Sequence, residues 1–144
     1  MKVKSFRGLL ASGTIQRIRL GTINGMTGYR VVKFSIITEN PGTTAYEHVA
    51  QVFTREPSAA SAVVNFDNPQ LLAVGFQKGD ELTYRSAGTL DIIFDSMKFN
   101  QDIFIAQVDT KDALNMNYYL ELEQVKLSLD EATVATLKDM RGRE

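Results

Sequence analysis

The sequence predicts an all-β fold with a minor helical part, and three observations lead to this expectation. β-branched and aromatic residues occur in short runs, several runs alternate apolar with polar side chains, and turn-forming Asn-Gly and Pro-Gly pairs separate them. Hydrophobic residues make up 44% of the 144 residues, which is enough to bury one core. We therefore expect one β domain over residues 1–127, followed by a helix and tail over residues 128–144.

The first expected strand covers Thr14–Leu20, where Arg17 and Arg19 share one face with Ile15. A turn is expected next, at Asn24–Gly28, because Asn and Gly adopt positive φ angles at little cost. This order of strand and turn favours a hairpin with the strand that follows.

The second expected strand covers Tyr29–Thr38 and is rich in β-branched residues. Strict alternation predicts a core face with Val32, Phe34 and Ile36 and an outer face with Tyr29 and Lys33. A loop with a Pro-Gly turn at Glu39–Thr44 leads to a third strand at Ala45–Phe53. The first half is therefore expected to form a three-stranded antiparallel meander.

A short helix is expected between the third and fourth strands. Asn68 is a suitable N-cap, Pro69 suits the first helical position, and Gly79 is a suitable stop after Lys78. Further strands are expected at Glu81–Asp95 with a break or bulge around Gly88, at Asp102–Asp109 and at Asn117–Leu127. A terminal helix should begin at Ser128, which has capping-box spacing to Glu131.

This order of elements is typical of an OB-fold: a five-stranded Greek-key barrel with a short helix between strands three and four. An extra hairpin and the C-terminal helix would complete it. A β-sandwich or jelly roll is the alternative, although these folds more often lack a helix at that place.

Charge is distributed unevenly along the chain. Residues 1–55 carry a net charge of +6, residues 56–144 carry −7, and the first acidic residue is Glu39. Such asymmetry indicates contact with nucleic acid or a membrane surface. The alternative is that the basic half faces the acidic half within one fold.

Signals for catalysis or export are weak. His48 is the single histidine, cysteine is absent, and no metal-binding or phosphate-binding motif occurs. We therefore expect no enzymatic activity, no cofactor, no metal and no small-molecule substrate. No apolar stretch is long enough for a membrane span or a signal peptide, so a cytoplasmic location is expected.

The basic and aromatic residues of the meander predict a surface for single-stranded nucleic acid. Such a surface combines cations that follow the phosphates with aromatic rings that stack on bases. The candidate residues are Arg17, Arg19, Tyr29, Arg30, Lys33, Tyr46, His48, Phe53 and Arg55. The alternative is that the aromatic residues belong to the core, and the parity of Phe53 with Val49 favours that for Phe53.

Four segments resemble the single-stranded DNA-binding protein family in its bacterial and phage forms. They are "GTIQRIRLGTINGMTGYRVVKFSIITEN", "YEHVAQVF", "LLAVGFQKGDELTYRSAGTL" and "YYLELEQV", which together cover roughly Gly13–Val125. The resemblance implies an OB-fold, a homo-oligomer, and a stacking role for Tyr46, with Phe53 near a second stacking position and Lys33 on a DNA-facing strand. The chain departs from the family in having no tryptophan and no Gly/Gln/Pro-rich linker with an acidic tip.

The sequence thus predicts a single-stranded DNA-binding protein with little sequence preference, which protects DNA during replication or recombination. A phage structural protein, such as a capsid-decorating or tail β-barrel, is the rival hypothesis. An OB-fold module that binds only proteins is a second rival.

Overall fold

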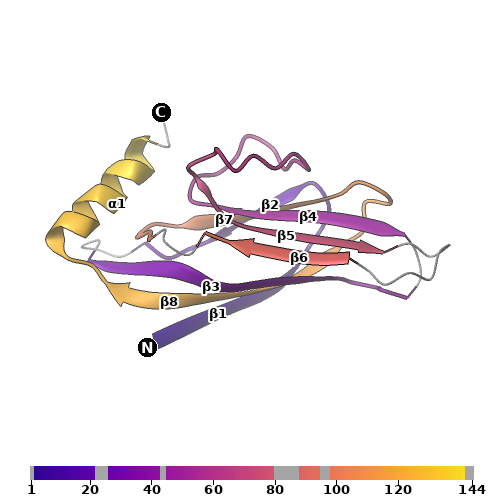
Figure 1. Cartoon of the computed structure of the whole chain (residues 1–144), viewed down its shortest axis with the longest axis horizontal. Coiled ribbons are helices and arrows are strands. Elements are labelled where there is room, and N and C mark those ends of the chain that lie inside the picture. Colours follow the sequence, from indigo (N-terminus) through magenta and orange to yellow (C-terminus); the bar gives the residue numbers. More distant parts are fainter. Residues whose placement is uncertain (1, 22–25, 43–44, 80–87, 95–97, 142–144) are drawn as a thin grey trace.

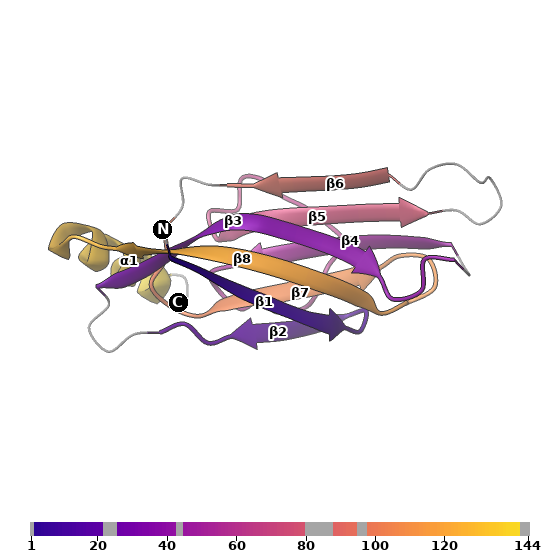
Figure 2. The same ribbon diagram turned by 90° about the horizontal axis from the view of Figure 1, so that it is seen from below.

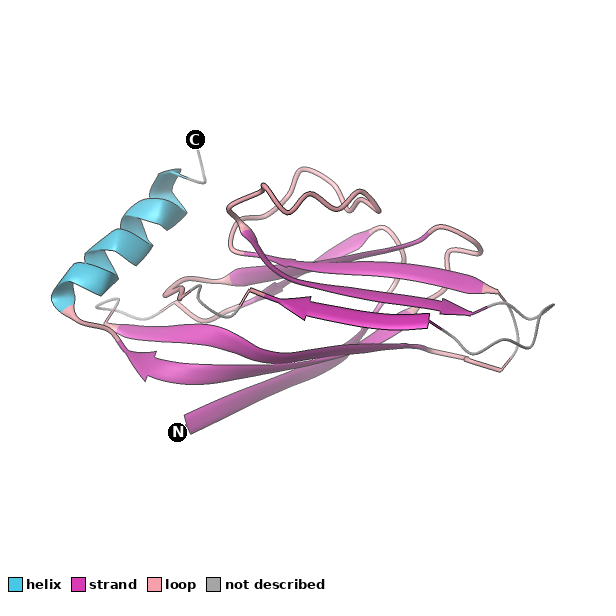
Figure 3. Ribbon diagram, in the orientation of Figure 1, coloured by secondary structure: helices cyan, strands magenta, loops and turns pink. Residues whose placement is uncertain are grey.

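The computed structural model describes residues 2–21, 26–42, 45–79, 88–94 and 98–141. Within these residues the chain forms eight strands and one helix, which confirms the all-β class with a minor helical part (Figures 1 and 3). The elements are β1 Lys2–Leu10, β2 Thr14–Ile18, β3 Thr27–Thr38, β4 Tyr46–Phe53, β5 Leu71–Gly79, β6 Gly88–Ile93, β7 Ile103–Asp109, β8 Met116–Lys126 and α1 Leu129–Arg141.

The strands form two antiparallel sheets that face each other. Sheet A has the order β1-β8-β3, and sheet B has the order β2-β7-β4-β5-β6. Figure 2 shows sheet A in front of sheet B, with α1 at one end of the molecule. The fold is therefore a β-sandwich of two open sheets.

The pairing of strands is nested along the chain. β1 pairs with β8, β2 with β7 and β4 with β5, while β3 lies beside β6 where the edges of the two sheets meet. A long hairpin rolled up in this way is the strand order of a jelly roll. The five-stranded OB-fold barrel expected from the sequence is not confirmed, because the strands form two open sheets rather than one closed barrel.

The helix predicted between the third and fourth strands is wrong, because Leu71–Gly79 is strand β5. Asn68 and Pro69 form a turn instead of a helix start: the Asn68 side chain accepts the N–H of Gln70, and its carbonyl accepts the N–H of Leu71. β5 is buried on both faces, so its sequence lacks the alternation that marks a half-buried strand. A short apolar run of this kind does not distinguish a strand from a helix.

Strand β1 was not expected from the sequence, yet it pairs with β8 over its full length. The other strand predictions agree in position with β2, β3, β4, β6, β7 and β8, and the predicted terminal helix agrees with α1. The predicted three-stranded meander is wrong, because β2 pairs with β7, β3 with β8, and β4 with β5 and β7. In α1, Ser128 and Glu131 form the expected capping box. Parts of the predicted turns at Asn24–Gly28 and Glu39–Thr44, and the first part of the predicted strand at Glu81–Asp95, lie outside the described residues.

A bulge in β3 changes which residues face the core. The register with β8 shifts between Val31 and Lys33, so Val32 is an extra residue. A one-residue shift exchanges the two faces of a strand. Odd-numbered residues therefore point inward before the bulge, where Tyr29 and Val31 are buried, and even-numbered residues point inward after it. The predicted core positions Phe34 and Ile36 are confirmed, whereas Val32 is only half-buried and Tyr29 lies in the core.

The main core lies between the two sheets. Its buried residues come from both of them: Leu10, Ile18, Leu20, Tyr29, Val31, Phe34, Ile36, Ala50, Val52, Leu72, Ala73, Phe99, Ile103, Ile105, Met116, Tyr118, Leu120 and Leu122. Gly75 on β5 lets the sheets approach closely, since a Cβ at this position would lie 3.2 Å from the Phe34 ring. Burial of this apolar surface is the main force that holds the two sheets together.

A second, smaller core covers the outer face of sheet B. The connection between β4 and β5, residues 54–70, lies over this face (Figure 1). Phe53, Leu71, Val74 and Ala106 are buried there, with Ile15, Ala60 and Phe94 packed against them. The Gln51 side chain fastens the connection by donating to the carbonyl oxygens of Ser61 and Val63. The centre of sheet B, around β4, is therefore covered on both faces.

Among the described residues, no helix has the length and apolar character required to cross a membrane.

Candidate functional site

The predicted stacking aromatics lie inside the molecule. Tyr29 is 2% exposed, Tyr46 4%, Phe53 8% and His48 0%. The expectation that these four side chains form an exposed surface is therefore wrong. Tyr46 and His48 point between the sheets, because they share the face of β4 that carries Ala50 and Val52 of the main core.

Tyr29 is a structural residue at the edge of sheet A. Its N–H and carbonyl pair with those of Phe99 at 2.8 Å and 3.0 Å, and the two rings lie 6.3 Å apart. Lys4 covers the ring, with Nζ 5.5 Å from the ring centroid and 3.4 Å from the hydroxyl oxygen. The bulge at Val32 places this ring in the core, so it cannot stack on a base without local unfolding.

His48 belongs to a buried polar network at the end of the sandwich opposite α1. The Gln107 amide donates to the carbonyls of Leu10 and Leu114, so its oxygen accepts from His48 Nδ1 at 3.1 Å. The His48 ring also stacks on Tyr46 with a centroid distance of 5.7 Å. These contacts give His48 a structural role, in which it joins β4 to the chain segments around Gln107.

Asp109 completes this network. Its carboxylate accepts from the N–H groups of Glu47, Lys111 and Leu114 at 2.9–3.0 Å. Burial alone would raise the pKa of Asp109, but these three donors and nearby His48 together lower it. The charged carboxylate therefore stabilises the folded chain at this end.

Two of the predicted basic residues are paired with acids from the second half of the chain. Arg17 Nε donates to Asp102 Oδ2 at 2.6 Å, and Arg30 Nε donates to Glu123 Oε2 at 2.5 Å. Burial raises the pKa of Asp102, but the N–H groups of Leu20 and Gly21 and the guanidinium of Arg17 lower it overall. These pairs support the alternative in which the basic half faces the acidic half.

The nine predicted residues do not form one surface. Arg17 and Arg19 belong to the β2 side of sheet B, and Arg55 lies just after β4; Arg19 and Arg55 are exposed. Tyr29, Tyr46, His48 and Phe53 are buried. Arg30 and Lys33 remain on β3, where Lys33 is exposed and its Nζ lies 5.8 Å from the centroid of the Tyr119 ring.

The outer face of sheet A carries a shallow depression of ≈ 530 Å³. The registers of β1, β8 and β3 align Arg7, Tyr119 and Ser35 in one row and Leu9, Asn117 and Ile37 in the next. We call these six residues, together with Lys33, the sheet A patch. Its composition is mixed: two cations, one aromatic ring, polar groups and two exposed apolar side chains.

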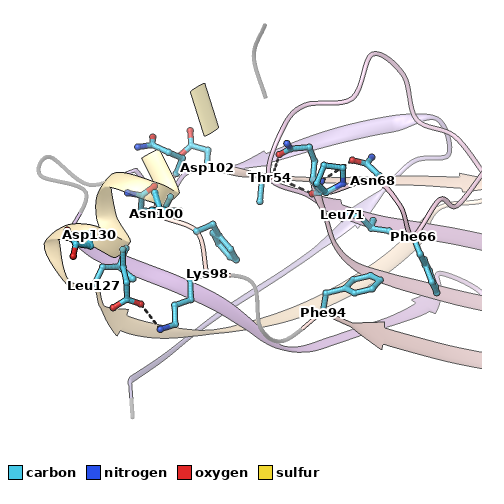
Figure 4. Close-up of a pocket in the computed structure, with 17 residues that line it drawn as sticks. Thr54, Phe66, Asn68, Leu71, Phe94, Lys98, Asn100, Asp102, Leu127 and Asp130 are labelled. Atoms are coloured by element: carbon cyan, nitrogen blue, oxygen red, sulfur yellow. Dashed lines mark hydrogen bonds and ion pairs between the residues drawn. The ribbon is translucent and has the colours of Figure 1, made fainter. Parts of the chain in front are cut away.

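A larger groove of ≈ 930 Å³ lies beside α1 (Figure 4). Apolar side chains from three regions line it: Phe66 of the β4–β5 connection, Phe94 after β6, and Val134 of α1. Phe66 is 56% exposed and Val134 52%, and the Phe66 and Phe94 rings meet edge to face at 5.3 Å. We call this the α1 groove. Polar and charged residues such as Asn68, Lys98 and Asp130 stand at its rim.

Polar side chains from the segment before β7 attach α1 to the sandwich. Asn100 donates to the carbonyl of Ala132 and to the hydroxyl of Thr136, and Lys98 pairs with Glu131 at 2.8 Å. Ala132 and Ala135 form the buried side of the helix, whereas Leu129, Val134 and Leu137 are exposed. The helix thus leaves apolar side chains uncovered beside the α1 groove.

Sequence reasoning missed Arg7 and Tyr119. Arg7 lies in β1, a strand in which Gly8 and the charged N-terminal residues obscure the alternation. For Tyr119 a signal was present, because it shares strand parity with Glu121 and Glu123 on the polar face of β8. That alternation predicts an outward Tyr119 next to an inward Tyr118.

No protein-family model matches the chain, and no curated protein matches it. Among the described residues, no cluster of three or more acidic or histidine side chains is arranged to hold a metal ion. Functional inference therefore starts from the fold, the α1 groove and the sheet A patch.

Proposed function

We propose that this chain is a structural protein that works by assembling with other protein surfaces, as a phage capsid-decorating or tail protein does. The observation that carries the proposal is the α1 groove, where Phe66, Phe94 and Val134 stay accessible in an otherwise well-packed sandwich. Contiguous exposed apolar side chains with a polar rim are typical of protein-interaction sites. The nested strand order agrees with this role, since jelly rolls occur among viral capsid domains as well as lectins and cupins.

Assembly through this region buries the exposed apolar residues of the β4–β5 connection and of α1. Val63, Val64 and Phe66 lie on the β4–β5 connection, and Val134 and Leu137 lie on α1. Burying such side chains against a partner is worth about 1.5–3 kcal/mol for each large one. A few of them, closely packed, suffice to hold an interface together.

Light scattering and electron microscopy of the purified chain test this proposal. We expect a molar mass that rises with protein concentration to multiples of the 16.0 kDa chain, and regular assemblies in negative stain. A monomer that persists up to the solubility limit, at both low and high ionic strength, would contradict the proposal.

Single-stranded DNA binding is the second candidate function. The buried aromatics Tyr29, Tyr46 and Phe53 no longer support it. One specific observation favours it: the sheet A patch joins Arg7, Lys33 and an accessible Tyr119 on one open sheet face.

A further inference from the structure

We infer that the sheet A patch is a contact site for single-stranded nucleic acid, with Tyr119 as the stacking ring and Arg7 and Lys33 as the phosphate-binding cations. The inference rests on the second candidate function, single-stranded DNA binding, and identifies the residues that carry it out. It does not depend on assembly through the α1 groove, which lies in another part of the molecule.

The geometry of the strands places these side chains on one face. Arg7 on β1 and Ser35 on β3 are both register partners of Tyr119 on β8. Neighbouring strands lie about 4.8 Å apart, so one such row spans roughly 10 Å across three strands. Ser35 is small and lines the depression together with Tyr119, whereas Gly8 leaves room for the inward-facing Tyr118 ring. A flat base can therefore approach the ring from the solvent side.

Tyr119 is held in place before any ligand binds. Its hydroxyl donates to Glu121 Oε1 at 2.6 Å, and Lys33 Nζ lies 5.8 Å from the ring centroid. The hydrogen bond to Glu121 also raises the pKa of Tyr119 above its ordinary value. A ring that is already ordered loses little conformational entropy when a base stacks on it.

Charge complementarity selects an anionic partner. Arg7 and Lys33 are exposed and form no ion pair within the described part of the chain, in contrast to Arg17 and Arg30, although Lys33 is the register partner of Glu121 on β8. The seven residues of the patch include no acid. Unpaired cations next to an aromatic ring are the combination that binds the phosphates and bases of a single strand.

Two acids of β8 border the patch: Glu121 lies in the same row as Lys33, and Glu123 lies in the row of Arg30. Glu121 is engaged by the Tyr119 hydroxyl, and Glu123 is paired with Arg30. The opposite side carries Leu9 and Ile37, which are 49% and 50% exposed and offer apolar contact to sugars and bases. A strand bound on the patch therefore extends from Lys33 and Tyr119 toward Leu9 and Ile37, away from the two glutamates.

Fluorescence anisotropy with labelled oligo(dT) at low salt tests the site. We expect Tyr119→Ala to weaken binding about 5- to 150-fold, the range for loss of one stacked base, and Tyr119→Phe to retain most of the affinity. Lys33→Ala should reduce the slope of log affinity against log salt by about 0.7. Arg19→Ala, which removes an exposed cation outside the patch, is the matched control and should bind like wild type.

The possible results distinguish failure of the sheet A patch from failure of single-stranded DNA binding itself. Wild-type binding that survives Tyr119→Ala and Lys33→Ala would overturn the patch while leaving single-stranded DNA binding intact. Absence of binding by the folded wild-type chain would overturn both, and capture of a protein rather than an oligonucleotide by the patch would also contradict the inference. Thermal unfolding of each variant shows whether a loss of affinity comes from loss of the folded structure.

Discussion

The two outer faces of the sandwich differ, and the difference explains where function can reside. The outer face of sheet B carries Phe53, Val74 and Ala106, and the β4–β5 connection covers them. The outer face of sheet A carries Arg7, Lys33 and Tyr119, and no described segment covers it. The covered face thus carries buried apolar residues, whereas the open face carries polar residues together with the exposed Leu9 and Ile37.

Burial on both faces also explains why the sequence wrongly predicted an exposed binding surface on β4. Seven of its eight residues are buried, because sheet A covers one face and residues 54–70 cover the other. An aromatic residue on such a strand is structural whichever way it points. On sheet A, by contrast, outward residues stay accessible, so an aromatic ring such as Tyr119 has access to a ligand there.

The largest effect should come from removing an outward residue of the covered face. Phe53→Ala should lower the free energy of unfolding by about 3–5 kcal/mol, because it leaves a cavity under the β4–β5 connection. Ile37→Ala, on the open face and 50% exposed, should cost less than about 1 kcal/mol. Equal losses in urea denaturation would show that the two faces do not differ as described.

The next effect concerns the polar network that fixes both sheets at the end opposite α1. Asp109→Asn removes a charge that accepts three N–H groups, and should cost about 2 kcal/mol at neutral pH. Since folding lowers the pKa of Asp109, its contribution is complete above the unfolded value of about 3.9 and is lost as the pH falls toward the folded value.

Urea denaturation at a series of pH values measures this contribution. The difference between wild type and Asp109→Asn should shrink below about pH 4. Asp67→Asn, an exposed control, should change stability by less than about 0.5 kcal/mol. A constant difference at all pH values would contradict the role given to the Asp109 carboxylate.

A smaller loss of stability is expected when the hydrogen bonds between Gln51 and the β4–β5 connection are removed. Gln51→Ala removes two hydrogen bonds to residues 54–70 and should cost about 1 kcal/mol each at most. Trypsin should then cleave faster after the exposed Arg55. Asn117→Ala, which removes an amide from the open face, should leave the cleavage rate unchanged; equal acceleration by both variants would refute a specific role for Gln51.

The smallest change in stability is expected for a substitution on the outer face of sheet A. Lys33→Ala should change the free energy of unfolding by less than about 0.5 kcal/mol, because Lys33 is exposed and makes no ion pair within the described residues. A loss above 1.5 kcal/mol in urea denaturation would indicate a structural role for the Lys33–Tyr119 contact.

Much of the secondary structure was predictable from local patterns. Alternation located most strands, and the Ser128–Glu131 spacing located the start of α1. The helix expected at Leu71–Gly79 was wrong because a strand buried on both faces has no alternation. The sheet order was beyond local patterns, since it depends on pairing between residues as distant as Lys2 and Gln124.

The candidate site was predicted less well, and one residue explains much of the error. The extra Val32 reverses the faces of β3, so Tyr29 enters the core while Lys33 stays outside. A bulge of this kind leaves no clear mark in the sequence. The pairs Arg17–Asp102 and Arg30–Glu123 likewise required the fold, because they join residues more than eighty positions apart.

Assembly through the α1 groove is tested most directly by the molar mass of a double variant, Phe66→Asp with Val134→Asp. Both side chains are more than half exposed, so the variant should fold, and Leu90→Asp on β6 is an equally exposed control outside the groove. We expect wild type and Leu90→Asp to form the same oligomers and the double variant to remain a 16.0 kDa monomer. The same mass distribution for all three chains would contradict assembly through this groove.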